Sequence, residues 1–163
     1  MLFRSWPNDL LISERKIGGI LCESGTGIRS DPFQIIGIGI NVNVDHNDWP
    51  TELRDSATSI WQERKISVDR NRLLAQLLLE LEQCLDELMV HGTNRIALAY
   101  HQRCSTIGRT VQATLGNGDI VVGLAEGISH DGSLRIRPQA THLGMGTTEM
   151  VHLRVADIIH IRT

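Results

Sequence analysis

The sequence predicts an α+β chain: a mainly antiparallel sheet comes first, helices follow, and a small β-barrel of the SH3-like kind comes last. Apolar, β-branched runs with short connections fill residues 9–43, and leucines at helical spacing fill residues 73–89. Short alternating runs separated by glycine turns fill residues 110–162. Short connections favour antiparallel pairing, and several short strands close together favour a curled barrel.

The first part of the chain contains three predicted strands, at residues 9–12, 16–23 and 33–43. A polar turn separates the first two, and a loop rich in glycine, serine and aspartate precedes the third. Alternation along the third strand gathers its branched side chains on one face, which we expect to pack inward. These side chains are Ile36, Ile38, Ile40 and Val42.

The middle of the chain contains the predicted helices. A short helical segment is expected to open at residues 56–60, and the strongest helix follows a Ser/Asp cap at residues 67–69 and ends at Gly92. A second amphipathic helix is expected over residues 93–104. The apolar positions of the strongest helix are Leu73, Leu74, Leu77, Leu78, Leu81, Leu85, Leu88 and Met89.

Beyond a boundary near residues 105–108, five short strands are predicted. Gly116-Asn117-Gly118 and His130-Asp131-Gly132 mark two hairpin turns, because Asn-Gly and Asp-Gly accept the positive φ angles that such turns need. The predicted strands are residues 110–115, 120–128, 133–138, 149–155 and 158–162.

The composition excludes several classes of function. A formal charge of −3 with no basic stripe argues against broad nucleic-acid binding. The three cysteines contain no Cys-x-x-Cys pair, which favours a reducing, cytoplasmic compartment, and the seven histidines lack metal-ligand spacing. Charged residues interrupt the longest apolar run, and no signal peptide precedes it, so no membrane association is expected.

Glycines and a lysine indicate a ligand site on the first sheet. Alternation puts Gly37, Gly39 and Asn41 on one face of the third strand, and Lys16 beside Gly18 on a face of the second. Bare backbone next to a cation suits a flat anionic ligand. A bulge, a close crossing or a solvated turn lysine are the simpler alternatives for each motif alone.

The Trp6-Pro7-Asn8-Asp9 segment adds an amide and a carboxylate at the start of the first of these strands. Together they suit a magnesium-bound phosphate or an incoming amine. An ordinary Pro-Asn-Asp turn is the alternative.

Three blocks in this order resemble the signature blocks of biotin–protein ligases, and a fourth, Ala57-Thr58-Ser59-Ile60, resembles a further block of that family. The resemblance extends over essentially the whole chain, including the leucine-rich helix and the C-terminal β-domain. The three blocks are Trp6-Pro7-Asn8-Asp9-Leu10-Leu11, Arg15-Lys16-Ile17-Gly18-Gly19-Ile20-Leu21-Cys22-Glu23 and Gly37-Ile38-Gly39-Ile40-Asn41-Val42-Asn43.

The resemblance implies a fold and an activity. Residues 1–106 would be the C-terminal half of a class II synthetase-like catalytic domain, and residues 107–163 an SH3-like barrel. The enzyme would condense biotin with ATP, in the presence of Mg²⁺, to biotinyl-5′-AMP, and then transfer biotin to a lysine of a biotin carboxyl carrier domain. A homodimer is a candidate assembly.

The resemblance also implies site residues. Lys16 would be the catalytic lysine that offsets charge on the carboxylate and α-phosphate, and Asp9 would orient or deprotonate the acceptor lysine. Asn41 would bind the adenine or neighbouring ligand atoms, and Asn8, with Asp9, would lie near the phosphates and a magnesium ion. The remaining residues expected to bind biotin or the adenylate are Gly18, Gly19, Gly37, Gly39 and Ala57.

Two departures from the family pattern bear on these expectations. Ser5 stands where the family usually has lysine, and the glycine/arginine-rich loop and biotin-ring residues that precede the tryptophan in the family are absent, which predicts a truncated ligase without a DNA-binding domain. One alternative is a non-catalytic module that docks a carrier domain or oligomerises through an exposed sheet edge. Another is a lipoate-type ligase.

Overall fold

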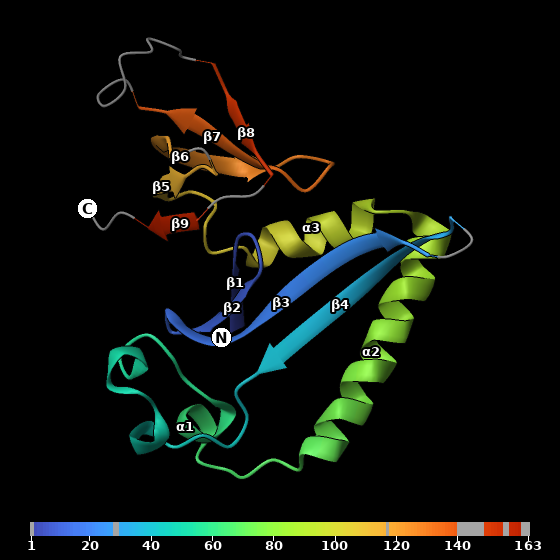
Figure 1. Cartoon of the computed structure of the whole chain (residues 1–163), viewed down its shortest axis with the longest axis vertical. Coiled ribbons are helices and arrows are strands. Elements are labelled where there is room, and N and C mark those ends of the chain that lie inside the picture. Colours follow the sequence, from blue (N-terminus) through green and yellow to red (C-terminus); the bar gives the residue numbers. More distant parts are fainter. Residues whose placement is uncertain (1, 28–29, 117, 140–148, 155–156, 161–163) are drawn as a thin grey trace. The chain divides into compact units, whose positions relative to one another are not determined.

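The structure, a computed structural model, describes residues 2–27, 30–116, 118–139, 149–154 and 157–160 (Figure 1). The chain forms two compact units. Unit 1 consists of Met1–Phe3 and Asn8–Leu77, and unit 2 consists of Arg4–Pro7 and Leu78–Thr163. Unit 2 is therefore discontinuous in sequence, because it includes a four-residue segment from the start of the chain.

The first sheet has four strands in the order β1-β2-β3-β4. The pairs β2–β3 and β3–β4 are antiparallel, which confirms the predicted meander (Figure 1). The predicted polar turn is tight, since Ser13 and Glu14 adopt φ angles of 50° and 65°. The first strand was not predicted, and the last ends at Ile40 rather than residue 43. The strands are β1 (Leu2–Ser5), β2 (Asp9–Ile12), β3 (Arg15–Thr26) and β4 (Pro32–Ile40).

The isoleucine face of β4 does not pack inward as expected. Ile36 is 43% exposed, and Ile38 and Ile40 are only partly buried. On the other side of the alternation, Phe33 and Ile35 are also exposed. A strand in a sheet becomes buried only where another layer covers it, so the exposure of Ile36 and the partial burial of Ile38 and Ile40 mean that this face of β4 is only partly covered within the described residues.

The predicted helices are present. The short helix α1 (Ile60–Arg64) is capped by Ser59, whose Oγ accepts a hydrogen bond from the Gln62 N–H. Two 3₁₀ turns, η1 (His46–Asp48) and η2 (Thr51–Leu53), precede it. These short elements bring Ser56 and Thr58 back to the start of β3, where both form backbone hydrogen bonds with Lys16.

The long helix α2 (Arg70–His91) begins after Asp69, whose Oδ1 accepts from the N–H groups of residues 71 and 72. It ends at Gly92, where φ is +66°. Both ends agree with the sequence pattern. None of its residues is buried, and the apolar stripe includes exposed side chains. The exposed members are Leu74, Leu78, Leu85 and Met89, and Leu79 and Val90, which lie outside the stripe, are exposed as well.

Unit 2 contains α3 (Asn94–Arg103) and a five-stranded sheet in the order β8-β7-β6-β5-β9. All five predicted C-terminal strands occur, although Asn117 of a predicted turn and residues 155 and 161–162 of the last two predicted strands lie outside the described part. The Asp131-Gly132 turn is present, with Gly132 at φ +82°. The strands are β5 (Thr110–Thr114), β6 (Ile120–Ile128), β7 (Leu134–Pro138), β8 (Val151–Leu153) and β9 (Asp157–His160).

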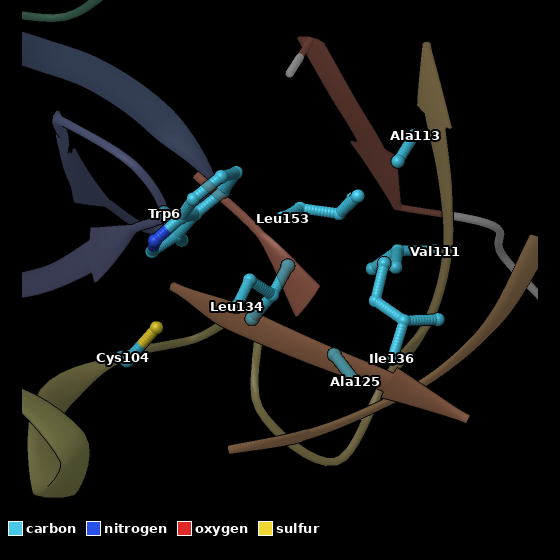
Figure 2. Packing of buried hydrophobic residues seen from close by; sticks show 8 residues of the cluster. All are labelled: Trp6, Cys104, Val111, Ala113, Ala125, Leu134, Ile136 and Leu153. Atoms are coloured by element: carbon cyan, nitrogen blue, oxygen red, sulfur yellow. The ribbon is translucent and has the colours of Figure 1, made fainter. Parts of the chain in front are cut away.

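The hydrophobic core of unit 2 combines side chains from its strands with two from outside the sheet (Figure 2). One of these is Trp6, which is 4% exposed and donates a 3.1 Å hydrogen bond from Nε1 to the Gly132 carbonyl. The Trp6 N–H also donates to Thr106 Oγ1 at 3.0 Å. The cluster consists of Trp6, Cys104, Val111, Ala113, Ala125, Leu134, Ile136 and Leu153.

Within the described ranges, none of the helices combines the length and apolar content required to cross a bilayer.

Candidate active site

Two residues predicted to be catalytic meet in unit 1. Lys16 Nζ lies 2.6 Å from Asp9 Oδ1. The Lys16 side chain is 51% exposed and the Asp9 side chain is 35% exposed, so the pair can be reached from solvent. A solvent-accessible ammonium and carboxylate in contact can exchange partners when a charged ligand arrives, because neither charge is held by burial.

A β-bulge accounts for this meeting. Asp9 pairs with Gly19 and Leu10 with Gly18, but Leu11 pairs with Lys16, so that Ile17 is an extra residue in β3. Regular alternation had predicted that Lys16 shares a face with Gly18. The extra residue instead turns Lys16 to the face of Asp9 and Gly19, since cross-strand partners share a face. The predicted face of Lys16 was therefore wrong.

The predicted glycines have two different roles in the sheet. A Cβ at Gly18 would lie 2.4 Å from the Gly39 carbonyl oxygen, so close approach of β3 and β4 requires glycine there. A Cβ at Gly39 would have no atom nearer than 3.9 Å, and one at Gly37 none nearer than 3.6 Å. Packing within the described chain therefore does not explain Gly37 and Gly39, and their open face is available to a ligand.

Gly19 borders the ion pair. A Cβ at this position would lie 3.5 Å from Lys16 Cε and 3.6 Å from Asp9 Oδ1. Gly19 is also the cross-strand partner of Gly39. The lysine, the carboxylate and the glycine-lined part of β3 and β4 therefore lie on one face of the sheet.

Asn41 and Ala57 lie next to Lys16, although their contacts are with the backbone. Asn41 Nδ2 donates to the Thr58 carbonyl at 3.1 Å and to the Lys16 carbonyl at 3.4 Å. Ala57 is 7% exposed and forms a parallel bridge with Lys16. The amide group of Asn41 thus joins β3 to the segment around Thr58, and both of these hydrogen bonds use its nitrogen.

A polar cluster around Glu63, close to Lys16 in the fold, was not predicted from the sequence. Glu63 Oε1 accepts hydrogen bonds from Thr58 Oγ1 and from an Arg15 guanidinium nitrogen, each at 2.7 Å. Glu63 lies in α1, the short helix that was expected to open at residues 56–60, but no motif in the sequence singled out its carboxylate.

Asn8 is exposed, and its carbonyl accepts a 3.0 Å hydrogen bond from the Ile20 N–H. Together with Asp9 it offers two neighbouring oxygen ligands. No group of three or more His, Cys, Asp or Glu residues in the described ranges is arranged to hold a metal ion. A cation here would therefore depend on further oxygens from a ligand.

Comparisons with known families agree with this geometry. Residues 1–43, which include β2, Lys16 and the glycine strands, match the model of the biotin/lipoate A/B protein ligase family. That match alone does not distinguish biotin from lipoate. Residues 106–159 match the biotin protein ligase C terminal domain. The chain belongs to the biotin–protein ligase family.

Individual relatives of this biotin–protein ligase chain are similar over most of its length. The bifunctional ligase/repressor BirA of Bacillus subtilis is 40% identical over 129 residues, which make up 79% of this chain and 39% of that protein. The biotin–[acetyl-CoA-carboxylase] ligase of Mycobacterium tuberculosis is 34% identical over 149 residues, or 91% of this chain and 52% of that protein. The chain therefore spans about two fifths to one half of the length of these relatives.

A solved structure shares the fold. The apo biotin protein ligase of Aquifex aeolicus superposes with a TM-score of 0.79 at 23% identity, covering 99% of this chain and 66% of that one. The antiparallel sheets and few helices described above are thus the biotin protein ligase fold.

Proposed function

We propose that the chain provides catalytic residues of a biotin–protein ligase, which forms biotinyl-5′-AMP from biotin and ATP and transfers biotin to a lysine of a biotin carboxyl carrier protein. The 2.6 Å contact between Lys16 and Asp9 beside Gly19 is the observation that carries this proposal. It brings together, on one face of the sheet, a cation that suits the reaction of a carboxylate with a phosphate and a carboxylate that suits an incoming amine. A biotin protein ligase of similar fold has been solved with biotin and ATP.

Lys16 would act in the first step. A biotin carboxylate oxygen attacks the α-phosphorus of ATP, the bond to the bridging oxygen breaks, and pyrophosphate leaves. The Lys16 ammonium would offset the negative charge that builds up as carboxylate and phosphate approach each other. Gly19, Gly37 and Gly39 would give the ligand access to the sheet, while Gly18 and Ala57 would support this floor by packing.

Asp9 would act in the second step. It would take a proton from the acceptor lysine, whose protonated amine is not a nucleophile. The neutral nitrogen then attacks the acyl carbon of biotinyl-5′-AMP, a C–N bond forms, the C–O bond to phosphate breaks, and AMP leaves. Asn41 would use its side-chain oxygen for the adenine amino group, because its nitrogen already donates to two carbonyls.

Asn8 and Asp9 would contribute oxygen ligands to a magnesium ion. Two ligands fit this ion, because Mg²⁺ in nucleotide sites commonly takes one or two protein oxygens and completes its shell with phosphate oxygens and water. When bound, the ion would screen the charge of the phosphates. Asp9 would then have to divide its oxygens between this ion and an amine.

The finer features of the fold are part of the proposal. Residues 1–106 would represent part of a class II synthetase-like catalytic domain, and residues 107–163 an SH3-like barrel. The match of residues 106–159 to the C-terminal domain of the family supports this division. Three free cysteines support a reducing, cytoplasmic location.

The experiment measures the two steps separately. Pyrophosphate release reports adenylate formation from ATP and biotin, and labelled biotin on a carrier domain reports transfer. We expect Lys16→Gln to slow adenylate formation by about 10²–10³-fold. Asp9→Asn should leave that step within a few fold and slow transfer by about 10²–10⁴-fold. Asp55→Asn, at an exposed carboxylate outside the site, is the matched control.

Three results would contradict the proposal in different ways. Normal rates for both substitutions would remove Lys16 and Asp9 from the chemistry. Labelling of the carrier with lipoate in preference to biotin would favour the lipoate alternative. Carrier binding without any adenylate formation by the unaltered chain, both alone and with a separately supplied N-terminal segment, would favour the non-catalytic docking module.

A further inference from the structure

The backbone of Lys16 is held on both sides by a segment distant in sequence. Its N–H donates to the Ser56 carbonyl at 2.7 Å, and its carbonyl accepts from the Thr58 N–H at 2.9 Å. Asn41 Nδ2 donates to the carbonyls of the same Lys16 and Thr58. Both backbone groups of the proposed catalytic residue are therefore fixed, although its side chain is half exposed.

A side-chain network closes a ring around this contact. Thr58 is fully buried, and its Oγ1 donates to Glu63 Oε1 at 2.7 Å. The same oxygen accepts from Arg15 at 2.7 Å, and Arg15 directly precedes Lys16. The ring thus runs from Lys16 to Thr58 through the backbone, to Glu63 and Arg15 through side chains, and back through one peptide bond.

This ring lies where β3 is least regular. The residue after Lys16 is the extra residue of the β-bulge, which interrupts the hydrogen-bond ladder to β2. Because the ladder is interrupted at the bulge, other contacts must fix the direction of the backbone there. Charge-assisted hydrogen bonds to a carboxylate that is mostly shielded from water can fix that direction, because they are stronger than neutral ones.

We propose that Glu63 is a positioning residue for Lys16, acting through Arg15 and Thr58. The inference rests on the proposed function of Lys16 in adenylate formation. Glu63 touches neither Lys16 Nζ nor Asp9 and is not expected to contact substrate. Its contribution is to hold the bulged backbone so that the ammonium lies where the reacting carboxylate and phosphate meet.

The expected signature is a loss of kcat for adenylate formation without a matching change in KM for ATP. A displacement of about 1 Å at a reacting group can cost up to about 100-fold in rate. We therefore expect Glu63→Gln and Thr58→Val to lower kcat by about 10- to 100-fold. Thr58→Ser keeps the hydroxyl and should restore kcat to within a few fold of the unaltered chain.

Two further arms separate positioning from general loosening of the segment. Gln62 is the neighbour of Glu63 in α1, and its Oε1 accepts a hydrogen bond from Trp49 Nε1. Gln62→Ala removes this bond but leaves the ring intact, so kcat should not change. In a Lys16→Gln background, Glu63→Gln should lower the residual rate no further, because the group that it positions is already absent. Unfolding in urea is measured for every variant.

The outcomes are distinct. Three results would each overturn the positioning role while the proposed function stands. The first is that Glu63→Gln lowers kcat equally in the Lys16 and Lys16→Gln backgrounds, and the second is that Gln62→Ala lowers kcat as much as Glu63→Gln does. The third is that kcat is unchanged in Glu63→Gln and Thr58→Val. If the unaltered chain forms no adenylate, either alone or with a separately supplied N-terminal segment, the proposed function fails and this inference fails with it. Loss of kcat only in the Lys16 background, with rescue by Thr58→Ser, supports the inference.

Discussion

Two glycine-to-alanine substitutions on neighbouring strands should differ in their effects. Gly18→Ala should lower the stability of the fold, whereas Gly39→Ala should preserve stability and weaken ligand binding. Gly18 and Gly39 lie in β3 and β4, and neither has a positive φ angle. A methyl group at Gly18 would lie 2.4 Å from the Gly39 carbonyl oxygen, whereas one at Gly39 would be 3.9 Å from its nearest neighbour. Gly18 is therefore required by packing within the sheet, whereas Gly39 leaves open space beside the strand.

The magnitudes follow from these distances. Overlap of a methyl with backbone forces the strands apart, and overpacking of this kind costs about 1–3 kcal/mol of unfolding free energy. Gly39→Ala meets no such overlap and reduces the freedom of the unfolded chain, so it should be neutral or stabilise by about 0.4–1 kcal/mol. If a ligand lies against the glycine face, the Gly39 methyl should weaken ATP binding by about tenfold or more.

Urea denaturation followed by tryptophan fluorescence measures the first quantity, because Trp49 and Trp61 both belong to unit 1. Titration calorimetry with ATP measures the second. Gly18→Ala with the stability of the unaltered chain would refute the packing role of Gly18. Gly39→Ala that binds ATP normally would refute a ligand on that face.

Three other predictions concern single contacts. Lys16→Gln and Asp9→Asn should each change the unfolding free energy by less than about 1 kcal/mol, because an exposed ion pair contributes little, and a larger loss in urea would contradict this. Trp6→Phe removes the partly buried hydrogen bond from Trp6 Nε1 to the Gly132 carbonyl and should lower the unfolding free energy by about 1–3 kcal/mol in the same assay, whereas unchanged stability would show that this bond does not stabilise unit 2. Hydrogen bonds from Ser133 and then Arg154 lower the pKa of Asp131 from 3.8 to about 2. Since the folded pKa is the lower one, this stabilisation is present above pH 4 and is lost as the pH falls towards 2. Ser133→Ala should raise that pKa in a carboxyl-carbon NMR titration, and an unchanged midpoint would assign the shift elsewhere.

The elements of the fold were largely predictable because their signals are local. The cap at Asp69 and the stop at Gly92 confine α2, and the turn glycine Gly132 separates two C-terminal strands where expected. β1 was missed, since four residues next to a Pro-Asn-Asp turn carry too short a pattern. The prediction that Ile36 packs inward was wrong, because alternation shows which residues share a face and not whether that face is covered.

The site was predictable in its residue types but not in its geometry. The motifs identified Lys16 and Asp9, yet their contact depends on one extra residue in β3, which has no distinct sequence signal at Ile17. The Glu63 network was missed for a related reason. It joins residues nearly fifty positions apart through side chains, and such a pairing cannot be read from a periodic pattern.

The place of Trp6 in unit 2 has a consequence for how the chain folds. Its indole completes a core whose other members lie at residues 104–153, and its hydrogen bond to Gly132 spans 126 positions. Contacts of such long range form late, because most of the chain must be closed into a loop first. During synthesis this large aromatic side chain emerges well before the strands that shield it. It therefore stays exposed to chaperones and to non-native contacts until the last part of the core has been synthesised.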